Sequence, residues 1–183
     1  VEDTAHESVD RMLRMNDCVD VIIPRGGAGL IRRVLETATV PVLETGVGNC
    51  HVYLDESANY GMAEAIVVNA KTQRPSVCNA METLLVNSVW ATAHLAKLLA
   101  KLHMLGVTIH GDAQVRAVDK LAVPAGEEDW ASEYLAPELA VKVVDSLEEA
   151  MAHIARYGTK HTEAIVTEDV ENARIFLHTV DAA

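Results

Sequence analysis

Short apolar runs alternate with segments of helical periodicity along most of this chain, and that alternation limits the folds open to it. Residues 89–105 show the helical period most clearly, with one apolar face formed by Leu95, Leu98, Leu99, Leu102 and Leu105. Runs typical of buried strands cover residues 19–23, 40–44, 50–55, 81–87, 107–111, 139–145 and 162–167. Successive parallel strands need a crossover, which a helix usually supplies. The sequence therefore predicts an α/β fold with a parallel, Rossmann-like sheet.

Polar residues mark the ends of several expected elements. Ser57 follows the run at 50–55 and is expected to cap the next helix. Ser146, with Glu149 three residues later, forms the pattern of a capping box before another helix. Residues 119–138 contain two prolines and a glycine, so a loop is expected there.

The composition excludes some classes of partner. The chain has 183 residues, of which 50% are hydrophobic, enough for about one domain or for one domain with part of another. A net charge of −12 repels nucleic acid and anionic membranes, and an aromatic content of 4% leaves few surfaces for base stacking. No window approaches about 18 consecutive apolar residues, and the first residues lack the order of a signal peptide. We expect a cytoplasmic protein that acts on small metabolites or contacts other proteins.

The cysteines are odd in number and scattered, which favours reduced thiols over a disulfide framework. Cys18 and Cys50 sit in or beside apolar runs and are expected in the core. Cys78 instead lies in a polar loop, shortly after Lys71 and Arg74. Those cations would lower its pKa if the loop folds back onto them, which would make the thiol a nucleophile. The alternative is a buried, inert cysteine.

Two further stretches have the context of a binding site. Gly26 and Gly27, in RGGAGL, lie between an expected strand and an expected helix, where backbone N–H groups receive phosphate. The full GxGxxG fingerprint fails, so a simple tight turn is the alternative. Glu44 ends a strand-like run before TGVGN, a position where open α/β sheets build sites, although a solvated glutamate at a strand end is the more common explanation. No metal is expected, since the spacing of the histidines does not fit a ligand pair: His94, His103 and His110.

Longer blocks of the sequence resemble one known family. They are IPRGGAGLI (23–31), VLETGVGNCHVYLD (42–55), VNAKTQRPSVCNAMETLLVN (68–87), and the stretch from VKVVDSLEEAMAHI to HTEAIVT (141–167). Together they resemble the γ-glutamyl phosphate reductase family of the aldehyde dehydrogenase superfamily, over essentially the whole chain. The resemblance implies an oxidoreductase of proline biosynthesis that uses NADPH to reduce γ-glutamyl phosphate, through a cysteine thioester, to glutamate 5-semialdehyde and phosphate.

The resemblance also implies roles for single residues. Cys78 matches the catalytic cysteine, and Glu133, in EYLAP, is similar to a glutamate that contacts the nicotinamide ribose. Gly26 and Gly27 correspond to a place near the cofactor's pyrophosphate. Glu44 aligns with the general base of hydrolytic relatives, which a reductase does not need, so it is named only as a possible proton carrier. Arg74 and Asn79 are our candidates for substrate binding.

The same resemblance divides the chain. Residues 1–45 are expected to be the end of a cofactor-binding domain, and residues 46–183 a catalytic domain that is incomplete at its C-terminus. The parent enzyme is expected to be a homo-oligomer, and the isolated chain to be inactive because it lacks most of the NADPH site. Two other functions are weighed: another aldehyde dehydrogenase-type oxidoreductase, and a non-catalytic α/β module with an inert Cys78.

Overall fold

The computed structural model describes residues 6–44 and 47–183, and the chain divides into two compact units, Val1–Val47 and Gly48–Ala183. The first unit contains the helices α1 (His6–Met12) and α2 (Ala28–Thr37). Its core is small and consists of Leu13, Val34 and Val40, each at most 2% exposed.

The prediction of strands at residues 19–23 and 40–44, in this unit, is wrong. One parallel bridge, between Ile22 and Val42, is all that forms between the two runs. A parallel strand is normally buried on both faces and paired along its length. Ile23 and Leu43 are 58% and 60% exposed, so neither condition holds within the unit. Cys18 is also exposed, which contradicts its expected place in the core.

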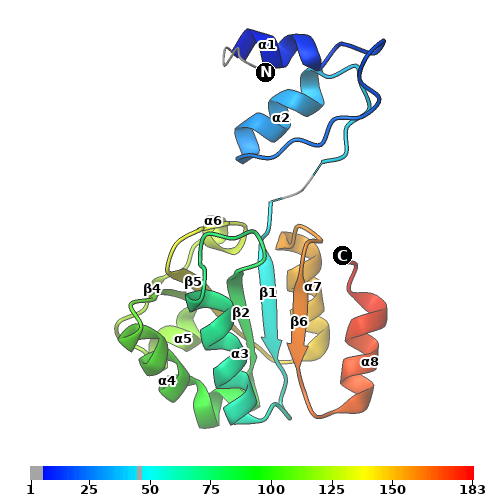
Figure 1. The fold of residues 1–183 in the computed structure, drawn as a ribbon. Coiled ribbons are helices and arrows are strands. Elements are labelled where there is room, and N and C mark those ends of the chain that lie inside the picture. The colour runs from blue at the N-terminus through cyan, green and yellow to red at the C-terminus, as the bar shows by residue number, and fades with distance from the viewer. Residues whose placement is uncertain (1–5, 45–46) are drawn as a thin grey trace. The chain divides into compact units, whose positions relative to one another are not determined.

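The second unit confirms the predicted parallel sheet. All of its strand pairs are parallel, in the order β4-β3-β5-β2-β1-β6 (Figure 1). The strands are β1 (Cys50–Leu54), β2 (Met81–Asn87), β3 (Thr108–Gly111), β4 (Val123–Pro124), β5 (Glu138–Val144) and β6 (Glu163–Val166). The central strands β1 and β2 are buried along their whole length, as their continuous apolar runs predicted.

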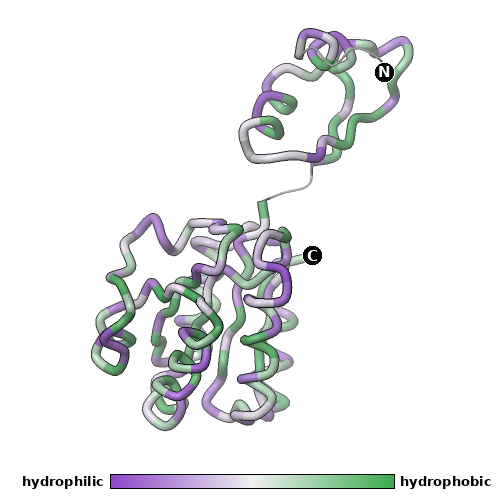
Figure 2. Tube along the Cα trace, turned by 60° about the vertical axis from the view of Figure 1, so that its left-hand side comes forward, coloured by the Kyte–Doolittle hydropathy of each residue, from purple (hydrophilic) through white to green (hydrophobic). Residues whose placement is uncertain are grey.

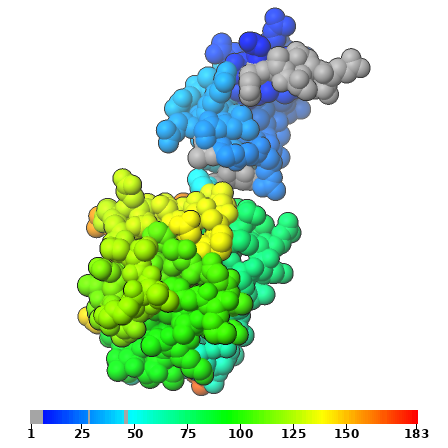
Figure 3. All heavy atoms as spheres, turned by 90° about the vertical axis from the view of Figure 1, so that its left-hand side faces the viewer, coloured from blue at the N-terminus to red at the C-terminus, as the bar shows by residue number. Residues whose placement is uncertain are grey.

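Helices cover both faces of this sheet. They are α3 (Tyr60–Thr72), α4 (Ser88–Met104), α5 (Ala113–Val118), α6 (Glu127–Trp130), α7 (Leu147–Tyr157) and α8 (Val170–Thr179). One core cluster joins α3, α4 and α5 to one face, and a second joins α7 and α8 to the other. Hydrophobic and hydrophilic colours alternate along the helices (Figure 2), and Figure 3 shows the face covered by α4 and α5. None of the helices in the described residues is long and apolar enough to cross a membrane.

Several expected ends differ in detail. Asn59, not Ser57, caps α3 by accepting from the N–H of Met62. The hydroxyl of Ser57 instead accepts from the N–H groups of Glu168 and Asp169, ahead of α8. The hydroxyl of Ser57 therefore accepts from backbone groups 111 and 112 residues away in the sequence instead of from the start of α3.

Other differences lie in α4, α7 and the expected loop. Leu105 lies just past the end of α4 and is 44% exposed, outside the predicted apolar face. Half of the capping box forms, because the hydroxyl of Ser146 accepts from the N–H of Glu149. The carboxylate of Glu149 accepts from the N–H of Asp145 rather than from that of Ser146. The expected loop at 119–138 contains the short elements β4 and α6.

The carboxyl end of β1 is held by a buried carboxylate. Asp55 is 2% exposed and accepts hydrogen bonds from Thr167 Oγ1 at 2.6 Å, Asn172 Nδ2 at 3.1 Å and Ser57 Oγ at 3.2 Å. Burial alone would raise the pKa of this carboxyl, but these donors outweigh burial and lower the pKa below its ordinary value. Asp55 thus ties β1 to the segment that leads from β6 into α8.

We expect Asp55→Asn to lower the free energy of unfolding by about 1.5–3 kcal/mol, because the amide replaces one acceptor oxygen in a charge-assisted network. The folded-state pKa of Asp55 is depressed, so its stabilisation is present above the unfolded-state pKa and is lost as pH falls through the folded-state value. The difference between the two proteins, measured by urea unfolding, should therefore be constant near neutral pH and shrink in acid. Glu168→Gln, on an exposed neighbour, is the control; a pH-independent difference would contradict the assignment.

Candidate active site

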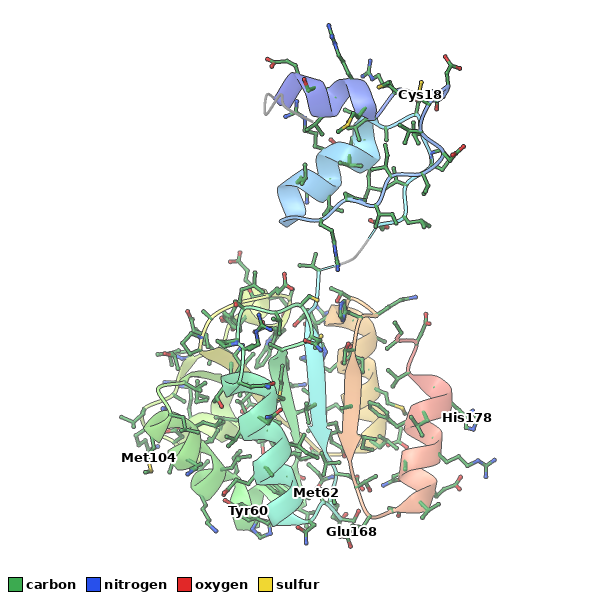
Figure 4. The ribbon with its side chains drawn as sticks, viewed as in Figure 1. Cys18, Tyr60, Met62, Met104, Glu168 and His178 are labelled. Atoms are coloured by element: carbon green, nitrogen blue, oxygen red, sulfur yellow. The ribbon has the colours of Figure 1, made fainter. Side chains whose placement is uncertain are left out.

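Cys78 lies in a loop at the amino edge of the sheet. The loop runs from the end of α3 to the start of β2, and because β1 and β2 are parallel, both strands begin at this edge (Figure 1). Tyr60 and Glu168 mark the opposite end (Figure 4). Glu44 was singled out by the rule that places sites at the carboxyl ends of strands. The return of α3 to the start of β2 puts Cys78 at the amino ends instead.

The loop has a regular backbone and an accessible thiol. Two turns follow each other. In the first, the N–H of Val77 donates to Arg74 O at 3.3 Å, and in the second the N–H of Ala80 donates to Val77 O at 3.0 Å. Cys78 itself is exposed, unlike the buried residue of the inert alternative. A nucleophile in this place can be reached by a substrate.

Arg74 and Asn79, the candidates for substrate binding, flank Cys78 in the same loop and are both exposed. Within the described residues, the guanidinium of Arg74 forms no ion pair. Its charge is therefore available to an anionic group that approaches the thiol.

Lys71 does not act on Cys78 as the sequence suggested. Its ammonium is fully buried and lies 2.5 Å from Glu82 Oε2, which is fully buried as well. Burial lowers the pKa of Lys71 and raises the pKa of Glu82, because an apolar interior disfavours both charges. Lys71 precedes the Cys78 loop and Glu82 follows it, so the pair closes the base of the loop.

Glu82 owes its position to a β-bulge. Cys50 pairs with Met81 and His51 with Thr83, so Glu82 is the extra residue of β2 opposite β1. Bulges of this kind re-aim side chains and are frequent beside active sites. Sequence reasoning missed Glu82, and nothing in the apolar run METLLVN indicates a bulge.

Glu133 is brought to the same edge of the sheet as Cys78. Its Oε1 accepts from the N–H of Gly48 at 2.8 Å, and Gly48 packs against the carbonyl of Cys78. Two residues further on, the N–H of Leu135 donates to Glu82 Oε1 at 3.3 Å. Leu135 has a φ of 52°, a left-handed conformation that is costly for a leucine and is frequent at functional sites. The predicted residues Cys78 and Glu133 therefore belong to one connected arrangement.

The other predicted residues lie in the first unit. Gly27 is the N-cap of α2 and Gly26 precedes it, both exposed. Glu44 is exposed and follows the Ile22–Val42 bridge, while Thr45 and Gly46 lie outside the described residues. Among residues 6–44 and 47–183, no group of three His, Cys, Asp or Glu side chains has the geometry of a metal site.

Comparison with solved structures defines the class of fold. The chain is similar to an acetylating aldehyde dehydrogenase from Geobacillus thermoglucosidasius, with a TM-score of 0.73 and 20% identity over 97% of this chain and 48% of the other. At that identity the likeness shows the fold alone, which is that of an aldehyde dehydrogenase. No family model matches the sequence.

More similar proteins are gamma-glutamyl phosphate reductases. The chain is 58% identical to a gamma-glutamyl phosphate reductase from Halalkalibacterium halodurans, over 100% of this chain and 44% of the relative. It superposes on the gamma-glutamyl phosphate reductase from Thermotoga maritima with a TM-score of 0.96 and 46% identity, over 100% of this chain and 44% of the other. Along its whole length the chain is therefore similar to gamma-glutamyl phosphate reductases, and it spans less than half the length of these relatives.

Proposed function

We propose that this chain is the thiol-bearing part of an NADPH-dependent enzyme that reduces γ-glutamyl phosphate to glutamate 5-semialdehyde and phosphate in proline biosynthesis. The observation that carries the proposal is the exposed Cys78, held in an anchored turn beside Glu133, in a chain 58% identical to a named reductase. Residues 1–45 would end the cofactor-binding domain and residues 46–183 would form most of the catalytic domain. The full-length protein would be a cytoplasmic homo-oligomer.

In the proposed reaction, the thiolate of Cys78 attacks the acyl carbon of γ-glutamyl phosphate. A C–S bond forms, the C–O bond to phosphorus-bound oxygen breaks, and phosphate leaves. The backbone N–H of Cys78 donates to the oxyanion of the tetrahedral intermediate. NADPH, when bound, supplies the hydride that reduces the thioester carbon. Cleavage of the C–S bond then releases the aldehyde and restores the thiolate.

Neighbouring residues are proposed to place the reactants. Arg74, whose guanidinium forms no ion pair within the described residues, meets the phosphate or the substrate carboxylate, and Asn79 donates or accepts hydrogen bonds beside the thiol. Glu133 fits a ribose of the cofactor: Oε1 accepts from Gly48, and Oε2 has no hydrogen-bond donor within the described residues.

Residues of the first unit are proposed to bind the cofactor and to carry a proton. Gly26 and Gly27 precede a ten-residue helix whose first N–H groups suit a pyrophosphate, since the Gly27 N-cap supplies no side chain there. Glu44 is proposed only as a proton carrier. Activation of water by this carboxylate would hydrolyse the thioester and waste the substrate.

The test places residues 1–183 in a whole enzyme. In a chimera, they replace the matching segment of the full-length Halalkalibacterium halodurans reductase, which is 58% identical. We expect phosphate-dependent reduction of NADP⁺ by glutamate semialdehyde, the reverse reaction, and weaker reduction of NAD⁺. The isolated chain should be inactive, because hydride transfer needs an oriented cofactor. A folded chimera without this activity would refute the proposed function.

A further inference from the structure

The carbonyl group of Cys78 is held by two residues at the start of β1. Cys50 Sγ donates a hydrogen bond to Cys78 O at 3.3 Å. Gly48 lies against the same oxygen, and a Cβ added to Gly48 would be 1.4 Å from it. Only a residue without a side chain fits there. The peptide that follows the exposed thiol is therefore fixed from two sides.

Cys50 is suited to be a donor rather than a nucleophile. It is 2% exposed, and burial, together with the nearby Glu163 carboxylate, raises the pKa of its thiol to about 12. The sulfur keeps its proton at neutral pH. The His161 ring nitrogen lies 3.9 Å from this sulfur. The Cys78 carbonyl, at the shorter distance, is the acceptor for the thiol proton.

The geometry points to Cys50 as a positioning residue for Cys78, acting through the carbonyl of Cys78. The inference rests on the proposed function, in which Cys78 is the nucleophile. An exposed turn samples several conformations unless it is anchored, and a nucleophile reacts fastest when its approach to the carbon is preset. The hydrogen bond from Cys50 and the contact with Gly48 fix the backbone torsion that follows the Cys78 Cα atom. They thereby limit the directions open to its thiol.

The experiment uses the full-length chimera with Cys50→Ala and Cys50→Ser. One neutral hydrogen bond contributes about 0.5–1.5 kcal/mol, so Cys50→Ala should lower kcat by roughly 2- to 10-fold with little change in KM. Cys50→Ser keeps a donor and should recover most of kcat. Gly48→Ala should lower kcat further than Cys50→Ala, because its methyl group displaces the carbonyl. Cys18→Ala, on an exposed cysteine that no step of the proposed reaction uses, is the matched control and should equal the parent.

A second readout does not depend on activity. Amide hydrogen exchange of the peptide containing residues 77–81 should accelerate in Cys50→Ala and return to the parent rate in Cys50→Ser. Unchanged exchange and kcat in Cys50→Ala would overturn the inference, and so would a Cys50→Ser protein as impaired as Cys50→Ala. A folded parent chimera without activity, whose exchange still follows this pattern, would refute the proposed function and with it the catalytic part of the inference, and would show only that Cys50 anchors the Cys78 turn.

Discussion

Cys78→Ser in the chimera is expected to reduce phosphate-dependent reduction of NADP⁺ by a factor on the order of 10³ or more, because a serine hydroxyl is not ionised at neutral pH and no other group replaces the thiolate. The fold should be unaffected, since Cys78 is exposed and its backbone rather than its sulfur makes the contacts with Gly48 and Cys50. Initial rates with saturating semialdehyde and phosphate measure the effect.

Cys18→Ser is the matched control for this variant. Cys18 is exposed as well, and it lies in the first unit (Figure 4). Its replacement should leave the rate unchanged. Iodoacetamide should also modify Cys78 before Cys50, whose thiol is buried and protonated. Full activity in Cys78→Ser would show that Cys78 is not the nucleophile.

The sheet of the second unit could be predicted because its central strands, β1 and β2, are buried on both faces. Burial of this kind imposes continuous apolar runs, such as METLLVN and LAVKVV, and these runs became β2 and β5. The first unit has similar runs around Ile22 and Val42, yet they form a single bridge. Apolar content records what a segment can bury, whereas a strand also needs neighbours along its edges.

Sequence reasoning placed Cys78 in a polar loop, and the structure has it exposed there, but the residues that support this loop were missed. Cys78 is recognisable in the sequence as a thiol among polar residues, and the resemblance to γ-glutamyl phosphate reductases pointed to Glu133. Gly48 and Glu82 carry no such signal, because a close backbone approach and a bulge are set by the pairing of distant segments. The predicted effect of Lys71 on Cys78 was wrong for the same reason. A lysine near a polar loop normally lies in water, and only the folded chain shows that its partner is Glu82, inside the protein.

Lys71→Met is expected to lower the free energy of unfolding by about 3–5 kcal/mol, because it leaves the buried Glu82 carboxylate without its partner. Glu82 has a raised pKa in the folded protein, so the penalty should grow as pH rises and shrink in acid, where the carboxyl takes up a proton. The double variant Lys71→Met/Glu82→Gln should recover most of the loss, since glutamine is uncharged and its carbonyl can still accept from the N–H of Leu135. Urea unfolding at several pH values measures all three proteins. A Lys71→Met protein within about 1 kcal/mol of the parent at neutral pH would mean that the pair is neutral in the folded state, with its proton on Glu82, and that the Cys78 loop is closed by packing rather than by charge.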